Sequence, residues 1–364
     1  MPDVEELKQF VTVHAGTQNI PPSRYLPLLE RIRTDEDGAP GSWTAEWSRE
    51  AERWAGEGDL LRASRHYAMA RFPYPDGPAR QEALRRCVST FDEWRRANTA
   101  IERHAVDTGA GTVHCLTTPL RPGGRRPVLL VMGGIVTVKE QWAPILLQAG
   151  RLGMHGVVAE MPGVGENTTR YGADSWRQIT AVLDSIGQYL DVSETYLVAL
   201  SFSGHMALRC ATTDERIRGI VTSGAPVSDF FTDAGWQARL PRITVDTLTH
   251  LTGMKEAALF AQLPAWRLDE PLLDALDIPV HYLASRRDEI IPAADPALLR
   301  RHLRRFHLME HDDVHGSPNH VLESRLWVVL SLLRMRRARA AQRAVLGLLL
   351  GAARAGSHLR RAPR

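Results

Sequence analysis

The feature with the clearest chemical meaning is an apolar β-type run that leads to Ser201, after which a helical pattern follows at once. A serine at such a strand-to-helix turn, a nucleophile elbow, has its hydroxyl lifted above a parallel sheet. The turn is strained, so its neighbours must be small. Ala199 and Ser203 stand where glycine is usual, and Gly204 comes one residue later. Ser203 fits less well as nucleophile, because His205 would occupy a small-residue position. The pattern predicts a nucleophilic Ser201, with an ordinary buried turn serine as the alternative.

A serine hydroxyl needs a base to take its proton and an acid to orient that base. Asp288 stands in the turn after the apolar run Val280–Ala284, followed by Ile290 and Pro292 in an Asp-x-Ile-x-Pro setting. This setting is typical of the orienting carboxylate. We therefore predict Asp288 as the acid, with Glu289 as the alternative and a surface ion pair as the non-catalytic explanation.

Histidines cluster after the last predicted strand, Phe306–Met309. His315, followed by Gly316, lies in the loop beyond this strand, from which an imidazole can point back at a serine. It is the predicted base, and His311 is the second choice. His320 is expected to begin the closing helix as a structural residue. The base must come within hydrogen-bond reach of the serine hydroxyl.

A glycine-rich turn, Met132-Gly133-Gly134-Ile135, follows an early strand and completes the predicted site. The backbone N–H of Ile135, together with that of Phe202 after the serine, would form an oxyanion hole. A second glycine-rich loop spans Glu160–Glu166. It lacks the Gly-Lys-Ser/Thr ending of a phosphate-binding loop, so that function is not favoured.

Composition excludes several other classes of function. The 364 residues carry a net charge of +3, too weak to indicate nucleic-acid binding. No signal peptide and no membrane-spanning apolar run is visible. Cys87, Cys115 and Cys210 have neither metal-ligand spacing nor a disulfide pattern, which favours structural thiols in a reducing cytoplasm. We expect no cofactor and no metal, and a small-molecule substrate, with a homodimer left open.

Periodicity predicts a helical region followed by an α/β core. Residues 1–100 carry helical apolar stripes, and from residue 101 onwards strands and helices alternate. This alternation predicts a doubly wound, mostly parallel sheet. We therefore expect a helical domain over 1–100, a core over 101–335 with a helical insertion at about 227–276, and a basic C-terminal helix or tail over 336–364. The pattern beyond Ser324 predicts one long, increasingly basic helix. The expected strands are Ile101–Val106, Thr112–Thr118, Val128–Met132, Val157–Ala159, Thr195–Leu200, Ile220–Ser223, Val280–Ala284 and Phe306–Met309.

Taken together, the motifs resemble the α/β-hydrolase superfamily, and more narrowly its branch with an N-terminal helical domain. The resemblance covers about residues 40–330. That branch includes dihydropseudooxynicotine hydrolase and other hydrolases that cleave carbon–carbon bonds in ketones. The sequence is also similar to hydrolase-like enzymes of spirotetronate polyketide pathways, which eliminate acetate from an acetylated tetronate. The resemblance implies a triad of Ser201, Asp288 and His315, and oxyanion donors at Ile135 and Phe202.

The same resemblance implies substrate-positioning roles for Gly134 and for Glu140, which follows Lys139 where the branch keeps a Lys-Glu pair. A buried ion pair or a helix-start carboxylate explains Glu140 equally well. The expected activity is hydrolysis of an ester or ketone of a polyketide-like compound, or elimination of an acyloxy group such as acetate. A thioesterase and a non-catalytic binding protein on a hydrolase scaffold are the alternatives.

Overall fold

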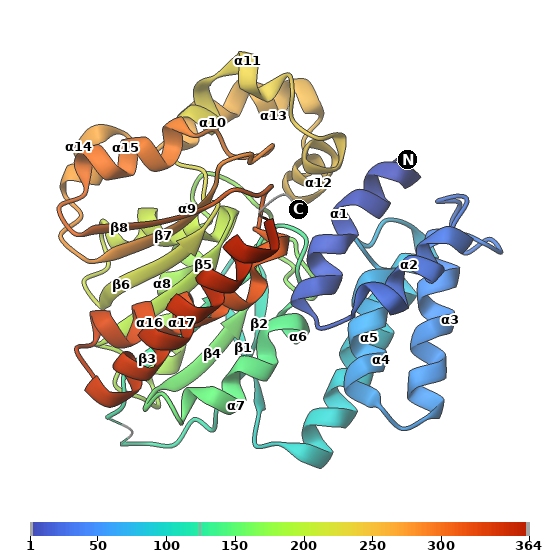
Figure 1. The fold of residues 1–364 in the computed structure, drawn as a ribbon, viewed down its shortest axis with the longest axis horizontal. Coiled ribbons are helices and arrows are strands. Elements are labelled where there is room, and N and C mark those ends of the chain that lie inside the picture. The colour runs from blue at the N-terminus through green and yellow to red at the C-terminus, as the bar shows by residue number, and fades with distance from the viewer. Residues whose placement is uncertain (1–2, 124, 362–364) are drawn as a thin grey trace.

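An eight-stranded sheet forms the centre of this computed structural model, which describes residues 3–123 and 125–361 (Figure 1). The strand order is β1-β2-β4-β3-β5-β6-β7-β8. Strand β2 pairs antiparallel with β1 and β4, and all other neighbours are parallel. The fold class predicted from the strand–helix alternation is confirmed. The strands are β1 Glu102–Asp107, β2 Thr112–Thr117, β3 Val128–Met132, β4 His155–Ala159, β5 Thr195–Leu200, β6 Ile217–Ser223, β7 Val280–Ser285 and β8 Phe306–His311.

The two faces of the sheet are covered by different helices. Side chains of α8 (Arg177–Gly187) and α9 (Phe202–Ala211) join the core on one face. Side chains of α7 (Leu146–Ala149) and α16 (Val321–Met335) join the core on the other face. The central strand β3 is buried along its whole length, as its uninterrupted apolar sequence predicts. The parallel strands therefore end at one edge between two helical layers, where loops can bring side chains together.

The N-terminal region consists of five helices beside the sheet, drawn in blue in Figure 1. Helix α4 begins at a capping residue, since Asp59 accepts a hydrogen bond from the Arg62 N–H. Helix α1 reaches back to the core. Glu6 accepts from the N–H of Ile243 in α12 (Arg242–Thr252), and Arg325 of α16 donates to the Thr17 carbonyl. The helices are α1 Val4–Thr17, α2 Pro22–Arg31, α3 Trp43–Gly56, α4 Leu60–Ala70 and α5 Gly77–Asn98.

The segment between β6 and β7 is helical, as expected for residues 227–276, and lies above the sheet edge in Figure 1. Its start is held by Asp295, which is fully buried and accepts hydrogen bonds from the N–H groups of Val227, Ser228 and Asp229. Its elements are α10 Asp229–Thr232, α11 Ala234–Gln237, α12 Arg242–Thr252, α13 Glu256–Gln262, the 3₁₀ turn Leu263–Trp266 and α14 Glu270–Asp274. The other short elements are α6 Lys139–Trp142, the 3₁₀ turns Ala143–Ile145 and Pro318–His320, and α15 Ala294–His302.

The expectation of one long C-terminal helix is wrong. Helix α16 ends at Met335, and Arg337 and Arg339 then adopt positive φ values of 51° and 52°. The chain turns there, and α17 (Ala340–Arg361) packs against α16, with Leu350 buried. Helical periodicity continues across the turn, so the sequence pattern hides it. Residues 362–364 of the predicted tail lie outside the described residues. Within the described chain, no helix is both long and apolar enough to cross a membrane.

Candidate active site

Ser201 occupies the sharp turn between β5 and α9, as the sequence pattern predicts. Its backbone has φ 56° and ψ −128°, a conformation that non-glycine residues rarely adopt. The Ser201 N–H donates to the carbonyl of Ser223 on the neighbouring strand β6, at 2.8 Å. Such strain persists only when the surroundings hold it in place. Ser201 therefore has the backbone geometry of a nucleophile elbow despite the missing glycines.

The structure explains the unusual residues around the elbow. Ser203 is fully buried, and its hydroxyl donates to the carbonyls of Met132 and Leu200, so a polar side chain is accommodated where glycine is usual. The close approach falls instead at Gly204, where a Cβ would lie 2.1 Å from Thr222 Oγ1 and 2.6 Å from Ala225 Cβ. The requirement for glycine has moved one residue along α9.

His315 and Asp288 come together with Ser201 in one chain of hydrogen bonds. The Ser201 Oγ lies 3.2 Å from His315 Nε2, and His315 Nδ1 lies 2.9 Å from Asp288 Oδ2. Asp288 is itself held, because its Oδ1 accepts from the N–H groups of Ile290 and Ile291. This geometry allows the imidazole to exchange a proton with the serine hydroxyl while the carboxylate fixes its tautomer.

The charge around His315 favours its protonated form. Burial lowers the pKa of His315, but the Asp288 carboxylate and, to a smaller extent, Glu289 outweigh it and raise the pKa above its ordinary value. Glu289, the alternative acid, accepts from the His315 backbone N–H at 3.0 Å. It therefore positions the loop, whereas Asp288 contacts the ring.

The other histidines of this segment have different surroundings. His311, the second choice for the base, stacks on His320 with ring centroids 4.1 Å apart, and burial lowers its pKa to about 4. Neither ring lines the cavity that contains Ser201. Asp313 accepts hydrogen bonds from the His320 ring and from the Asn319 backbone. This buried network fixes the loop that carries His315.

The predicted oxyanion donors lie next to the serine. Ile135 and Phe202 both line the cavity, and within the described residues their N–H groups have no hydrogen-bond partner. A Cβ at Gly134 would lie 3.1 Å from Ser201 Cβ, so a side chain there would crowd the serine. Two unpaired N–H groups beside a serine hydroxyl can stabilise negative charge on a substrate oxygen.

Glu140, the predicted substrate-positioning residue, lies in a buried ion cluster and does not line the cavity. The Lys139 ammonium is 2.8 Å from Glu140, 3.5 Å from Glu160 and 2.7 Å from Glu166. Burial alone would lower the pKa of Lys139, but these carboxylates raise it. The cluster joins the loops that follow β3 and β4, so its visible role is to hold the oxyanion turn.

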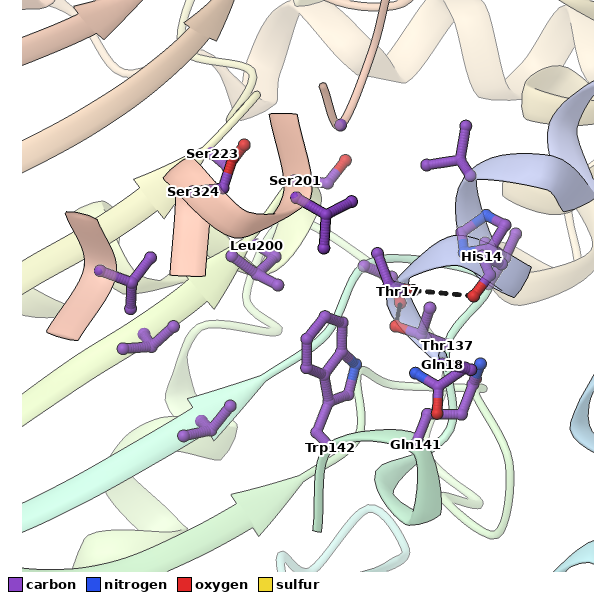
Figure 2. Close-up of a pocket in the computed structure, with 18 of the residues that line it drawn as sticks. His14, Thr17, Gln18, Thr137, Gln141, Trp142, Leu200, Ser201, Ser223 and Ser324 are labelled. Carbon is purple, nitrogen blue, oxygen red and sulfur yellow. Dashed lines mark hydrogen bonds between the residues drawn. The ribbon is translucent and has the colours of Figure 1, made fainter. Parts of the chain in front are cut away.

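A cavity of about 780 Å³ opens above Ser201 (Figure 2). Its walls come from helices far apart in the sequence, α1, α6, α12 and α16, together with the ends of β5, β6 and β7. Most of the lining is apolar. Its volume lies within the range of pockets that enclose a drug-sized ligand. The site can therefore surround a medium-sized apolar molecule and present one of its polar groups to Ser201 and His315.

Sequence reasoning missed His14, Arg71 and Gln141 near this cavity. His14 lies in α1, Gln141 in α6, and Arg71 directly after α4, all in ordinary helical surroundings. No motif marks them, because their proximity depends on how the N-terminal helices pack against the core.

The elbow, the triad geometry and the mostly parallel sheet define an enzyme of the α/β-hydrolase fold. The chain is 49% identical to AbyA5, which superposes with a TM-score of 0.92 over 96% of this chain and 99% of AbyA5. It belongs to the same α/β-hydrolase family as AbyA5.

More distant relatives share the fold. 2,6-Dihydroxy-pseudo-oxynicotine hydrolase superposes with a TM-score of 0.69 at 19% identity, over 88% of this chain and 96% of the hydrolase. Esterase FrsA from Vibrio vulnificus strain YJ016 is 23% identical over 317 residues, which cover 76% of each chain. No protein-family model matches the sequence. The predicted membership of the α/β-hydrolase superfamily, in a branch with N-terminal helices, is confirmed.

Proposed function

We propose that this enzyme eliminates an acyloxy group such as acetate from a polyketide-derived substrate, with Ser201, His315 and Asp288 as its catalytic residues. The supporting observation is the hydrogen-bonded chain of these three residues at a mainly apolar cavity. The resemblance to acetate-eliminating enzymes of spirotetronate pathways, and 49% identity to AbyA5, support the choice of reaction.

In the proposed elimination, neutral His315 removes a proton from the carbon next to the one that carries the ester oxygen. The C–H electron pair forms the new C=C bond, and the C–O bond breaks with its pair leaving on acetate. The N–H groups of Ile135 and Phe202 hold the ester carbonyl oxygen as negative charge develops on the leaving group. Ser201 positions the imidazole and the ester through its hydroxyl. The proton on His315 then passes to acetate or solvent.

Hydrolysis is the second candidate, because the same atoms suit it. Ser201 Oγ is 3.2 Å from the imidazole nitrogen that would take its proton, and the oxyanion donors are unpaired. In this reaction Ser201 attacks the ester carbonyl, the alcohol leaves, and water releases the acyl group from the serine. Elimination yields an alkene and no acyl-enzyme, whereas hydrolysis yields an alcohol and an acetyl-serine intermediate.

The test uses a tetronate bearing an acetoxymethyl group, with products followed by NMR. We expect acetate and an exocyclic alkene from the wild-type enzyme, and at least a hundredfold slower release from Ser201→Ala and His315→Asn. His307→Gln is the matched control, because His307 is exposed on β8 and does not line the cavity. Full activity of both triad variants would overturn the assignment. Release of a thiol from acyl thioesters would favour a thioesterase. Binding of the substrate without turnover would favour a non-catalytic binding protein.

The proposed location is the cytoplasm, which Cys87, Cys115 and Cys210 support as free, buried thiols. A homodimer stays a prediction. Light scattering of the purified protein gives its mass in solution and decides between one chain and two.

A further inference from the structure

The cavity above Ser201 has two chemically different sides. Figure 2 shows His14, Gln18 and Gln141 grouped on the side formed by α1 and α6, across from Leu200 and Ser201. These polar side chains are separate from the triad and from the oxyanion turn, and the reaction described above does not use them. Polar groups that converge on one side of a mainly apolar pocket usually fix the orientation of the ligand.

Gln141 presents hydrogen-bond donors to the cavity. Its side-chain oxygen Oε1 accepts from the Val138 N–H at 2.9 Å and from Arg71 Nη2 at 3.3 Å, so both of its acceptor positions are used by the protein. These two partners also fix the orientation of the amide, because an NH₂ group there would face two donors. The Nε2 group has no hydrogen-bond partner among the described residues. A ligand that meets Gln141 must therefore supply an acceptor.

Arg71 places a positive charge behind Gln141. Its side chain is 1% exposed, and its guanidinium donates to the carbonyls of Pro73 and Val136 and to Gln141. Within the described part of the chain, no carboxylate forms an ion pair with it. Burial lowers its pKa to about 10, so the group stays charged at neutral pH. A buried cation without a paired anion favours negative charge nearby and polarises the amide hydrogen-bonded to it.

His14 supplies a second polar group on the same side. Its ring packs against Phe72 at a centroid distance of 5.1 Å, and within the described residues its ring nitrogens have no hydrogen-bond partner. Burial, with the nearby charges of Arg71 and His315, lowers the pKa of His14 to about 3. The imidazole is therefore neutral and carries one N–H donor. It can hydrogen-bond a ligand oxygen without competing with His315 for a proton.

We propose that Gln141 and His14 form a subsite of hydrogen-bond donors that binds a negatively charged oxygen of the substrate. Arg71 lies behind Gln141 as a positioning residue. The oxygen belongs to a part of the substrate other than the ester group at Ser201, so the subsite determines which carbon faces His315. This inference rests on the proposed function for the identity of the reacting group. It does not depend on turnover, because it concerns the binding of a non-reacting part of the molecule.

The test measures binding of two probes to the wild-type enzyme by calorimetry. Tetronic acid, an enolised β-dicarbonyl that is anionic at neutral pH, is compared with its neutral O-methyl ether. Neither probe has a leaving group, so binding is read without catalysis. We expect Gln141→Glu to weaken binding of the acid about tenfold or more, and to change binding of the ether less than threefold. The variant keeps the Oε1 acceptor that Val138 and Arg71 need, and replaces only the donor.

Gln148→Glu is the matched control, because Gln148 lines the same cavity on α7 and receives the same change of charge. We expect it to leave the affinity for the acid within threefold. His14→Phe should weaken binding of the acid, and His14→Gln, which restores a donor, should recover most of it. Equal effects of Gln141→Glu and Gln148→Glu would overturn the proposal. So would wild-type protein that binds the ether as tightly as the acid, whether or not the enzyme eliminates acetate.

Discussion

Replacing Asp288 with asparagine should remove nearly all activity without disturbing the loop that carries it. Asp288 Oδ1 accepts from the N–H groups of Ile290 and Ile291, so the Asn oxygen would occupy that position. The Asn NH₂ would then occupy the position of Oδ2, which lies 2.9 Å from His315 Nδ1. Asp288 Oδ1 also lies 3.0 Å from His315 Nδ1, so in the variant the ring nitrogen meets both an oxygen and an NH₂ group. The NH₂ group competes with the proton on Nδ1 and favours the tautomer that carries its proton on Nε2. The imidazole then faces Ser201 with a proton and cannot act as the base.

The expected loss is about 10⁴-fold in kcat, or about 5.5 kcal/mol of transition-state stabilisation, as found when a triad carboxylate becomes an amide. The pH dependence should change as well. Asp288 raises the pKa of His315, so wild-type activity should rise with pH through a value above 6.5 as the imidazole becomes neutral. In Asp288→Asn the carboxylate that raises the His315 pKa is gone, while burial still lowers this pKa. The rise of activity with pH should therefore occur at lower pH than in the wild type.

The assay follows acetate release against pH, together with NMR titration of the His315 ring. Glu289→Gln is the matched control, because among the described residues its side chain accepts only from the His315 backbone, and Gln retains an acceptor. We expect this control to stay within about tenfold of wild type. Asp288→Asn with a rate within tenfold of wild type and an unchanged pH profile would refute the role assigned to Asp288.

Two further predictions concern stability, measured as free energy of unfolding in urea. Gly204→Ala should lower the free energy of unfolding by about 1–3 kcal/mol, because its Cβ would meet Thr222 and Ala225. Gly347→Ala, which has open space around it, should be neutral or stabilising. Equal effects of the two variants would contradict the close packing at Gly204. Lys139→Met should lower the free energy of unfolding by about 3–5 kcal/mol, because it leaves buried carboxylates without a cation. Lys8→Met, which removes an exposed ion pair, should lower it by less than about 1 kcal/mol. A tolerated Lys139→Met would show that the buried cluster is not held by its ammonium.

The elements that the sequence predicted well are those whose geometry is local. The buried strand Val128–Met132 is apolar throughout, and the Ser201 turn needs only its neighbours to be recognised. The order of serine, acid and histidine along the chain also reflects local turns at successive strand ends. These features place Ser201, Asp288 and His315 near one another before any packing is known.

The features that the sequence missed depend on contacts between distant segments. Both acceptor positions of the Gln141 oxygen are filled because Arg71, 70 residues earlier, joins Val138 there. His14 reaches the cavity because α1 contacts both α12 and α16. The reversal at Arg337 and Arg339 was missed because residues with positive φ there are arginines, which have no turn signature.

In the proposed elimination His315 removes a carbon-bound proton while acetate leaves, and Ser201 positions the ester and does not attack it. The most direct measurement compares single-turnover acetate release from the acetoxy substrate with and without deuterium at the carbon that loses the proton, while intact protein mass is recorded. We expect slower release from the deuterated substrate and an unmodified enzyme. Equal rates for the two substrates, with an acetyl group on Ser201, would contradict it and establish hydrolysis.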